Sequence, residues 1–281
     1  MFVARSHLEP FYKDSKKLEA DLKVAAESST EDGKLFEWLC LDDDVWPALC
    51  PVFERRLGTR KGFEAWLLKA DSLGFQLSPD MKRIGAYFVL LELREFGGHT
   101  LWNRAGKIPH YEDIVRNVHD RVSTRFGIAT RKEMSVADRE LSLSAIILRE
   151  SLDQLSADKV KSLLKDANFD SVSDWTELRQ GLLEKIGTVG VSSIKSIVGK
   201  QAAKKFGASL IETAFGANRL AKAGSIGGFA SKVLPLALRR AGLYISLGFL
   251  LKDAYQLGGE ATRVTNPAVI IISLYRSFSG R

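Results

Sequence analysis

The stretch SPDMKRIGAYFVLLELREFG, residues 78–97, decides the fold class of this chain. Ser78 can cap a helix, Pro79 suits the first helical position because its missing N–H is not needed there, and Gly97 is a typical helix end. The apolar residues between them recur at helical spacing and cover a broad face. We therefore expect a helix from Pro79 to Phe96 in the first core, with five inward residues: Ile84, Tyr87, Phe88, Leu91 and Leu93.

The segments on either side of this stretch show the same helical periodicity. A helix is expected from Pro109 to about Arg125, and another from Ser135, where Ser135 and Asp138 resemble a capping box with Asp in place of Glu. No alternating apolar–polar stretch is long enough to predict a strand, so the chain is expected to be all-α. Shorter helices are expected at Lys34–Cys40, Val45–Leu57, Gly62–Leu73, Ala157–Asp166 and Trp175–Ile186.

A break in charge divides the chain. Residues 182–281 carry 14 Lys and Arg against 4 Asp and Glu, a net charge of +10, whereas residues 1–181 carry 27 against 30, a net charge of −3. A region that is both cationic and apolar suits an anionic membrane surface or a second core, whereas nucleic acid matches only its charge. We expect an N-terminal helical bundle over residues 1–186 and a basic, glycine-rich, apolar helical part over residues 187–281.

Glycine interrupts the C-terminal part repeatedly. Each interior glycine weakens a helix by up to about 1 kcal/mol, so a concentration of them needs a physical reason. One reason is close helix–helix contact of the kind typical of packing in lipid, because small residues stand four apart at three places: Ala203/Gly207, Gly224/Gly228 and Gly242/Ser246. The alternative is that the glycines form loops, with residues 224–228 as a turn between two helices.

Two apolar runs, Ala241–Leu251 and Pro267–Tyr275, are shorter than a transmembrane helix. Arg240 and Lys252 bracket 11 uncharged residues, and Val264–Tyr275 contains 12, whereas a bilayer core needs about 20. Such runs suit a buried, re-entrant or interfacial helix. The first residues lack the apolar core of a secretory signal, so we expect a cytoplasmic protein, with a peripheral place at the inner face of the membrane where it binds lipid.

No constellation of catalytic, metal-binding or cofactor-binding residues stands out in the sequence. His110 and His119 are nine apart, so they do not share a helix face like the i, i+4 ligands of a zinc protease. The G-x-S-x-G esterase motif and a phosphate-binding glycine loop are absent. Cys40 and Cys50 lack a neighbouring histidine and are expected to be buried thiols. We therefore expect no catalytic residue, no metal and no cofactor, and a protein that is not an enzyme.

Three stretches resemble a family of uncharacterised bacterial proteins, the YaaW type, parts of which have a distant similarity to a ubiquinol–cytochrome c chaperone domain. The stretches are residues 92–98, residues 132–135 and residues 261–269. The residues that carry the resemblance at the first and last stretches are Phe96, Gly97, Gly98, Arg263, Val264 and Pro267.

The resemblance extends from about residue 35 to the C-terminus and is weakest between residues 155 and 255. In the last stretch the sequence departs from the family, because Thr262 stands where an aromatic is usual and Asn266 where an aliphatic is usual. The resemblance implies a mainly helical bacterial protein with a glycine-rich, apolar end and no assigned activity.

Pro267 predicts the start of the last helix. Proline lacks a backbone donor and pushes the preceding residue out of the helical region, so the helix is expected to start at or beside Pro267, with Thr265 or Asn266 as its cap. The run from Val269 to Leu274 is apolar on every side, which predicts burial against Tyr244–Leu251. Arg263 is expected to reach solvent, to pair with a carboxylate, for which Glu260 and Asp253 are nearest in sequence, or to contact a lipid phosphate or a partner.

Two functions from different classes fit the basic, apolar part. The first is a non-enzymatic helical protein that associates with an anionic membrane surface, with reversible insertion as its extension. Each cationic side chain near an anionic leaflet contributes roughly 1 kcal/mol. The charge would come from Lys195, Lys200, Lys204, Lys205, Arg219, Lys222, Lys232, Arg239 and Arg240. The apolar contact would come from Leu243, Ile245, Leu247, Phe249, Leu250 and Leu251.

The second function is a chaperone-like interaction or assembly protein that binds a protein partner. In this interpretation Ala241–Leu251 and the isoleucine run Val269, Ile270, Ile271 and Ile272 form an internal core. Nucleic acid is disfavoured as a partner, because the basic part has few aromatics to stack bases and is too apolar for a solvated duplex-binding face. The identity of the partner and the oligomeric state are not predicted by the sequence.

Overall fold

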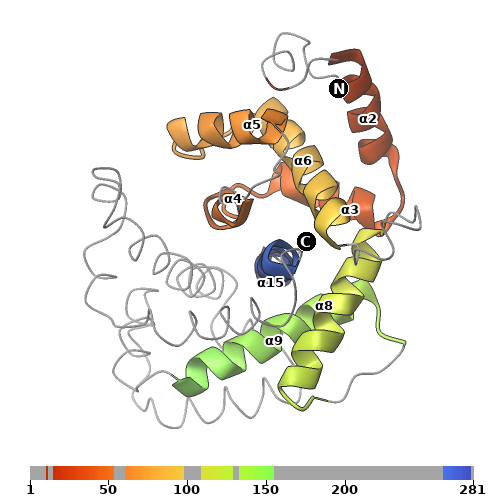
Figure 1. The fold of residues 1–281 in the computed structure, drawn as a ribbon, viewed down its shortest axis with the longest axis vertical. Coiled ribbons are helices and arrows are strands. Elements are labelled where there is room, and N and C mark those ends of the chain that lie inside the picture. Colours follow the sequence, from red (N-terminus) through yellow and green to blue (C-terminus); the bar gives the residue numbers. More distant parts are fainter. Residues whose placement is uncertain are drawn as a thin grey trace. The chain divides into compact units, whose positions relative to one another are not determined.

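The structure is a computed structural model that describes residues 11, 15–53, 61–97, 109–128, 133–154 and 262–279. Throughout these ranges the regular structure is helical and contains no strand, which confirms the all-α prediction. The described helices (Figure 1) are α2 (Ser15–Glu27), α3 (Glu31–Leu41), α4 (Trp46–Phe53), α5 (Lys61–Ser72), α6 (Pro79–Gly97), α8 (Tyr111–Arg125), α9 (Val136–Gln154) and α15 (Thr262–Ser279).

Two of the predicted helix starts are confirmed by their caps. The Oγ of Ser78 accepts a hydrogen bond from the N–H of Met81 at 3.3 Å, at the start of α6. Before α9, the N–H of Asp138 donates to the Oγ of Ser135 at 3.1 Å, and the Asp138 carboxylate accepts from the Ser135 N–H at 3.3 Å. This reciprocal pair is the capping box, with the shorter Asp side chain in place of Glu.

The chain divides into two units of dense internal contact. The first contains residues 1–118, 258–269 and 281, and the second contains residues 119–257 and 270–280. The boundary falls inside α8, after Val118, and inside α15, after Val269. The predicted division near residue 186 lies outside the described residues and stays a prediction.

An aromatic cluster forms the core of the first unit. Helix α6 contacts α2, α3 and α5, and the Phe63 ring lies 5.3 Å from both Phe53 and Phe88, measured between centroids. Trp66 is fully buried and donates its indole N–H to the carbonyl of Met81 at 2.9 Å, so its polar atom is satisfied. Its ring lies directly over Gly85, where an added Cβ would overlap it, and so this interior glycine allows α5 and α6 to approach closely.

Helix α15 differs from the expected one at its start. It begins at Thr262, so the prediction that it starts at Pro267 is wrong, and Pro267 lies inside it. Every residue from Val264 to Tyr275 is buried, so backbone groups before the proline have little access to water. A helix gives those groups internal hydrogen bonds, and this gain offsets the donor that Pro267 lacks.

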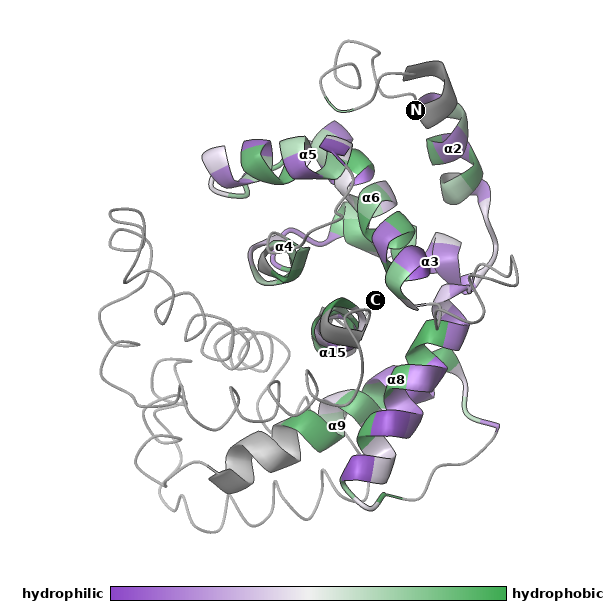
Figure 2. Cartoon of the chain, in the orientation of Figure 1, coloured by the Kyte–Doolittle hydropathy of each residue, from purple (hydrophilic) through white to green (hydrophobic). Residues whose placement is uncertain are grey.

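Burial on every face distinguishes α15 from the amphipathic helices. Figure 2 shows hydrophilic and hydrophobic residues alternating along α8, for example. In α15 the run Val269–Ile272 is buried, together with Val264 and Pro267. A helix that is apolar and buried all round is a core helix. Within the described ranges, no helix has both the length and the hydropathy to cross a membrane.

Candidate functional site

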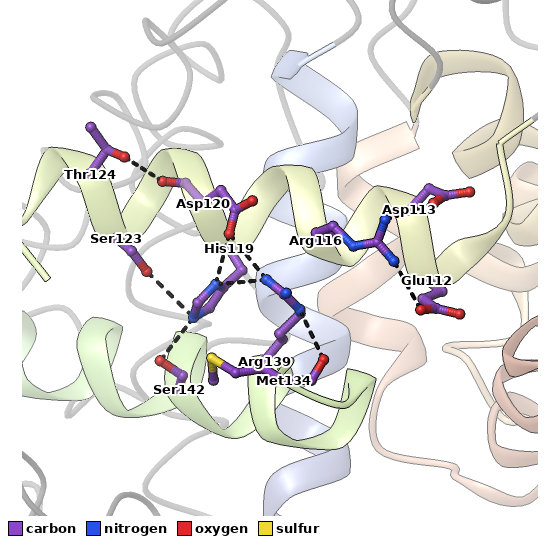
Figure 3. A network of polar contacts seen from close by, with 10 residues as sticks. All are labelled: Glu112, Asp113, Arg116, His119, Asp120, Ser123, Thr124, Met134, Arg139 and Ser142. Carbon is purple, nitrogen blue, oxygen red and sulfur yellow. Dashed lines mark hydrogen bonds and ion pairs between the residues drawn. The ribbon is translucent and has the colours of Figure 1, made fainter. Parts of the chain in front are cut away.

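Among the described residues, a network of polar contacts joins α8 to α9 in the second unit (Figure 3). We call it the α8–α9 cluster and define it by five residues: His119, Asp120, Ser123, Arg139 and Ser142. Three of them come from α8 and two from α9, with His119 at its centre. The His119 side chain is 1% exposed, so its ring needs partners inside the protein.

The His119 ring has a partner at each nitrogen. Its Nε2 lies 3.0 Å from the Oγ of Ser142 and 3.4 Å from that of Ser123. Its Nδ1 lies 3.3 Å from Oδ1 of Asp120 and 3.4 Å from Nη1 of Arg139. Serine at Nε2 and a carboxylate at Nδ1 are the order found in a Ser–His–Asp hydrolase, so the protonation of the ring decides what the cluster can do.

The Arg139 guanidinium opposes a catalytic role for this arrangement. A guanidinium only donates hydrogen bonds and a carboxylate only accepts them, so Arg139 and Asp120 require opposite protonation of Nδ1. Arg139 pairs with the same Asp120 oxygen at 3.0 Å and so competes with the ring for the carboxylate that a hydrolase triad uses to orient its histidine. The cluster therefore has the geometry of a structural contact between two helices.

Burial lowers the pKa of the His119 ring. The hydrogen bond to Asp120 raises the pKa and the charge of Arg139 lowers it, but burial is the largest cause. The neutral ring is thus the stable form near neutral pH. Asp120 is half-exposed. Its Oδ1 lies 3.0 Å from the Arg139 guanidinium and 3.3 Å from the His119 ring, so it is closer to Arg139.

A second buried contact joins α9 to the end of α15, also in the second unit. The Arg276 guanidinium pairs with the Glu140 carboxylate at 2.7 Å, and both side chains are largely buried. The Oγ of Ser144 donates to the Glu140 carbonyl at 2.9 Å. The same Oγ lies 3.1 Å from the Oγ of Ser277. Helix α9 thus holds α8 through Arg139 and α15 through the adjacent Glu140.

The other described histidine has a structural role in the first unit. The Nδ1 of His110 lies 2.8 Å from the carboxylate of Asp32, which also accepts the N–H of Tyr111 at 2.6 Å. Asp32 therefore caps α8 from α3, a tertiary cap that only the fold brings together. In the ranges that the structure covers, no group of three or more His, Cys, Asp and Glu is placed to hold a metal.

Cys40 and Cys50 are thiols and are not joined in a disulfide. Cys50 is buried, whereas Cys40 is only partly so. Burial raises the pKa of Cys40 to about 12, although the nearby charges of Arg83 and Lys82 act in the opposite direction. Because the thiolate is the reactive form, Cys40 is a poor nucleophile at neutral pH.

Most of the residues expected to bind an anionic surface lie outside the described residues. These are the nine basic residues from Lys195 to Arg240 and the six apolar ones from Leu243 to Leu251, and the family-motif residue Gly98 lies outside as well. The Arg263 side chain is also outside the described part of the chain, so its predicted contact with solvent, a carboxylate, or a lipid or partner stays a prediction. Of the other family-motif residues, Gly97 ends α6, where an added Cβ would overlap Ile114, and Val264 and Pro267 are in the buried part of α15.

Comparison with known proteins gives no relative: no protein-family model, no curated protein and no solved structure matches this chain. The resemblance to the YaaW-type family therefore stays a prediction from the sequence.

Proposed function

We propose that this protein is a non-enzymatic helical protein that binds an anionic membrane surface through the charge of residues 182–281. The observation that carries the proposal is the net charge of +10 in this region, against −3 in the rest of the chain. Lys and Arg near an anionic leaflet contribute roughly 1 kcal/mol each, so a few of them acting together suffice for reversible binding.

The burial of α15 limits how such binding occurs. Residues Val264–Tyr275 are enclosed by protein on every face, so the second apolar run is not available for insertion in this conformation. Charge and the run Ala241–Leu251 then remain as the binding elements. Electrostatic attraction at a surface is screened within about 8 Å at physiological salt, so the proposal predicts binding that salt reverses.

Vesicle flotation tests this proposal. The full chain is mixed with phosphatidylglycerol vesicles or with phosphatidylcholine vesicles, at about 0.05 M and about 0.5 M salt. We expect the protein to float only with the anionic vesicles and only at low salt. A protein that stays at the bottom under all four conditions, or that floats equally well with both lipids, contradicts the proposal.

A pair of matched variants assigns the effect to the basic region. The triple change Lys200→Gln, Lys204→Gln and Lys205→Gln removes three charges from that region, whereas Lys16→Gln, Lys17→Gln and Lys69→Gln removes three from residues 1–181. Loss of about 1 kcal/mol per charge at the surface predicts at least tenfold weaker binding for the first variant only. Equal weakening in both variants would show that overall charge, not this region, sets the binding.

A protein-binding function is the second candidate, and the burial of α15 favours it. An interaction protein needs its apolar runs as an internal core, and Pro267–Tyr275 behaves in this way. The basic residues would then meet an acidic partner. A chain that purifies without detergent as a single species and floats with neither lipid supports this candidate over the first, and light scattering of the same sample reports its oligomeric state.

A further inference from the structure

We propose that the buried ion pair between Glu140 of α9 and Arg276 of α15 is a register lock. It selects one of two positions, about one helical turn apart, that α15 can take along α9. All the residues concerned belong to the second unit. The lock is independent of the proposed membrane function, because it acts inside the protein and involves no lipid.

Two polar contacts define the observed register of α15 against α9. Nη1 of Arg276 donates to Oε1 of Glu140 at 2.7 Å, and the two side chains are only 17% and 5% exposed. The Oγ of Ser144 lies 3.1 Å from the Oγ of Ser277. Glu140 and Ser144 stand one turn apart on one face of α9, and Arg276 and Ser277 are neighbours in α15. Both contacts therefore depend on the same position of one helix along the other.

A shift of α15 by four residues is compatible with the serine contact. Four residues are about one turn, or about 6 Å along the helix axis. Ser273 would then replace Ser277 opposite Ser144, and the aliphatic Ile270 would replace Leu274. Among the described residues, the Oγ of Ser273 is buried without a hydrogen-bond partner, and the shift would give it one in Ser144. A serine four residues before Ser277 thus makes the shifted register a competitor.

The ion pair opposes this shift. In the shifted register Ile272 would replace Arg276 opposite Glu140, so the buried carboxylate would lose the guanidinium and face a hydrocarbon. Removing one partner of a buried ion pair is strongly destabilising, because the remaining charge stays away from water. The isoleucine side chains attract their neighbours without direction and discriminate less sharply between the two positions. The charge pair therefore selects the register.

Selection of a register differs from a contribution to stability. A buried ion pair is often no more stabilising than two apolar side chains of the same size, since both charges have lost their hydration. Setting the register of a helix is the best-attested use of buried polar groups in such cores. Replacement of both Glu140 and Arg276 by apolar residues should therefore leave a folded protein in which α15 populates both positions.

Disulfide trapping in the full chain reads the register directly. The observed-register pair is Ser144→Cys with Ser277→Cys, whose hydroxyls lie 3.1 Å apart, and the shifted-register pair is Ser144→Cys with Ser273→Cys. Each protein is oxidised briefly with copper phenanthroline, and the disulfides are assigned by mass spectrometry of peptides, which separates them from any that involve Cys40 or Cys50. With the ion pair intact, we expect the observed-register pair to close at least about 100-fold faster. Comparable rates would overturn the proposal.

Removal of the lock gives the decisive comparison. The double change Glu140→Met and Arg276→Met replaces both charges by unbranched apolar side chains, and we expect it to bring the two closing rates within about tenfold of each other. The matched control is the swap Glu140→Arg with Arg276→Glu, which keeps an ion pair and should keep the preference for the observed register. If the observed-register pair remains at least about 100-fold faster in the double-Met protein, the register is set elsewhere and the proposal is wrong.

A milder variant covers the case in which the double-Met protein shows no cooperative thermal unfolding. Glu140→Gln keeps the shape of the side chain but removes the charge that would be buried opposite Ile272 in the shifted register. We expect the shifted-register pair to close at least about tenfold faster in this variant than with Glu140 in place. An unchanged rate would overturn the proposal.

Discussion

Helices α6 and α15 are both buried, but they are specified in different ways. Helix α6 has a cap at Ser78, a proline at its first position, a glycine at its end and an exposed Glu95, so its sequence marks its own limits. Helix α15 has a proline inside it and no exposed residue between Val264 and Tyr275. The comparison teaches that local signals define a helix that meets water, whereas packing defines a helix that does not.

The comparison is tested most strongly by an isoleucine in each helix. Ile84 in α6 and Ile271 in α15 are both fully buried, so Ile84→Ala and Ile271→Ala remove the same group from two cores. We expect each change to lower the free energy of unfolding by about 2–5 kcal/mol, measured by urea denaturation without lipid. If Ile271→Ala leaves the free energy of unfolding unchanged while Ile84→Ala lowers it, α15 is not a core helix in solution.

A smaller effect is expected where α6 meets Trp66. Gly85→Ala places a Cβ against a fully buried indole ring, which has little room to move, so we expect a loss of about 1–3 kcal/mol by the same method. Gly97→Ala is the companion change, because its Cβ meets the aliphatic chain of Ile114, which can rotate. A Gly85→Ala protein that is more stable than wild type would show that this close approach does not exist.

The smallest expected effect is at the cap of α6. Ser78→Ala removes the acceptor for the Met81 N–H and should lower the free energy of unfolding by about 1 kcal/mol. Thr30→Ala is the control, because Thr30 occupies the N-cap position of α3 without a side-chain capping bond. The stability of both variants is measured by thermal unfolding. Equal losses of stability in Ser78→Ala and Thr30→Ala would mean that the Ser78 hydrogen bond adds nothing to the stability of α6.

Much of the fold was predictable because its signals are local. The bounds expected for α6 differ from the observed ones by one residue, and the capping box at Ser135 forms as predicted. Helix α2 was not among the expected helices, although Leu18 and Leu22 stand four apart in it. The start of α15 was placed at Pro267 because the sequence alone does not show how fully that helix is buried.

The α8–α9 cluster was not predictable from the sequence. Arg139 and Ser142 stand about twenty residues from His119, beyond the end of α8, and no motif links them. Only the packing of α8 against α9 brings a guanidinium to Nδ1 and a hydroxyl to Nε2. A histidine in a helix with a strong amphipathic pattern was the sole signal, because burial of a polar ring requires partners somewhere in the fold.

The central claim is that α15 belongs to the core while charge, not α15, meets the membrane. Hydrogen–deuterium exchange of the full chain, free and with phosphatidylglycerol vesicles, tests it most directly, with α6 as the internal reference. The account predicts that peptides from residues 264–275 exchange as slowly as those from residues 84–93 in the free protein, and that vesicles leave both unchanged. Rapid exchange of residues 264–275 in the free protein, with protection appearing only on the vesicles, would contradict it.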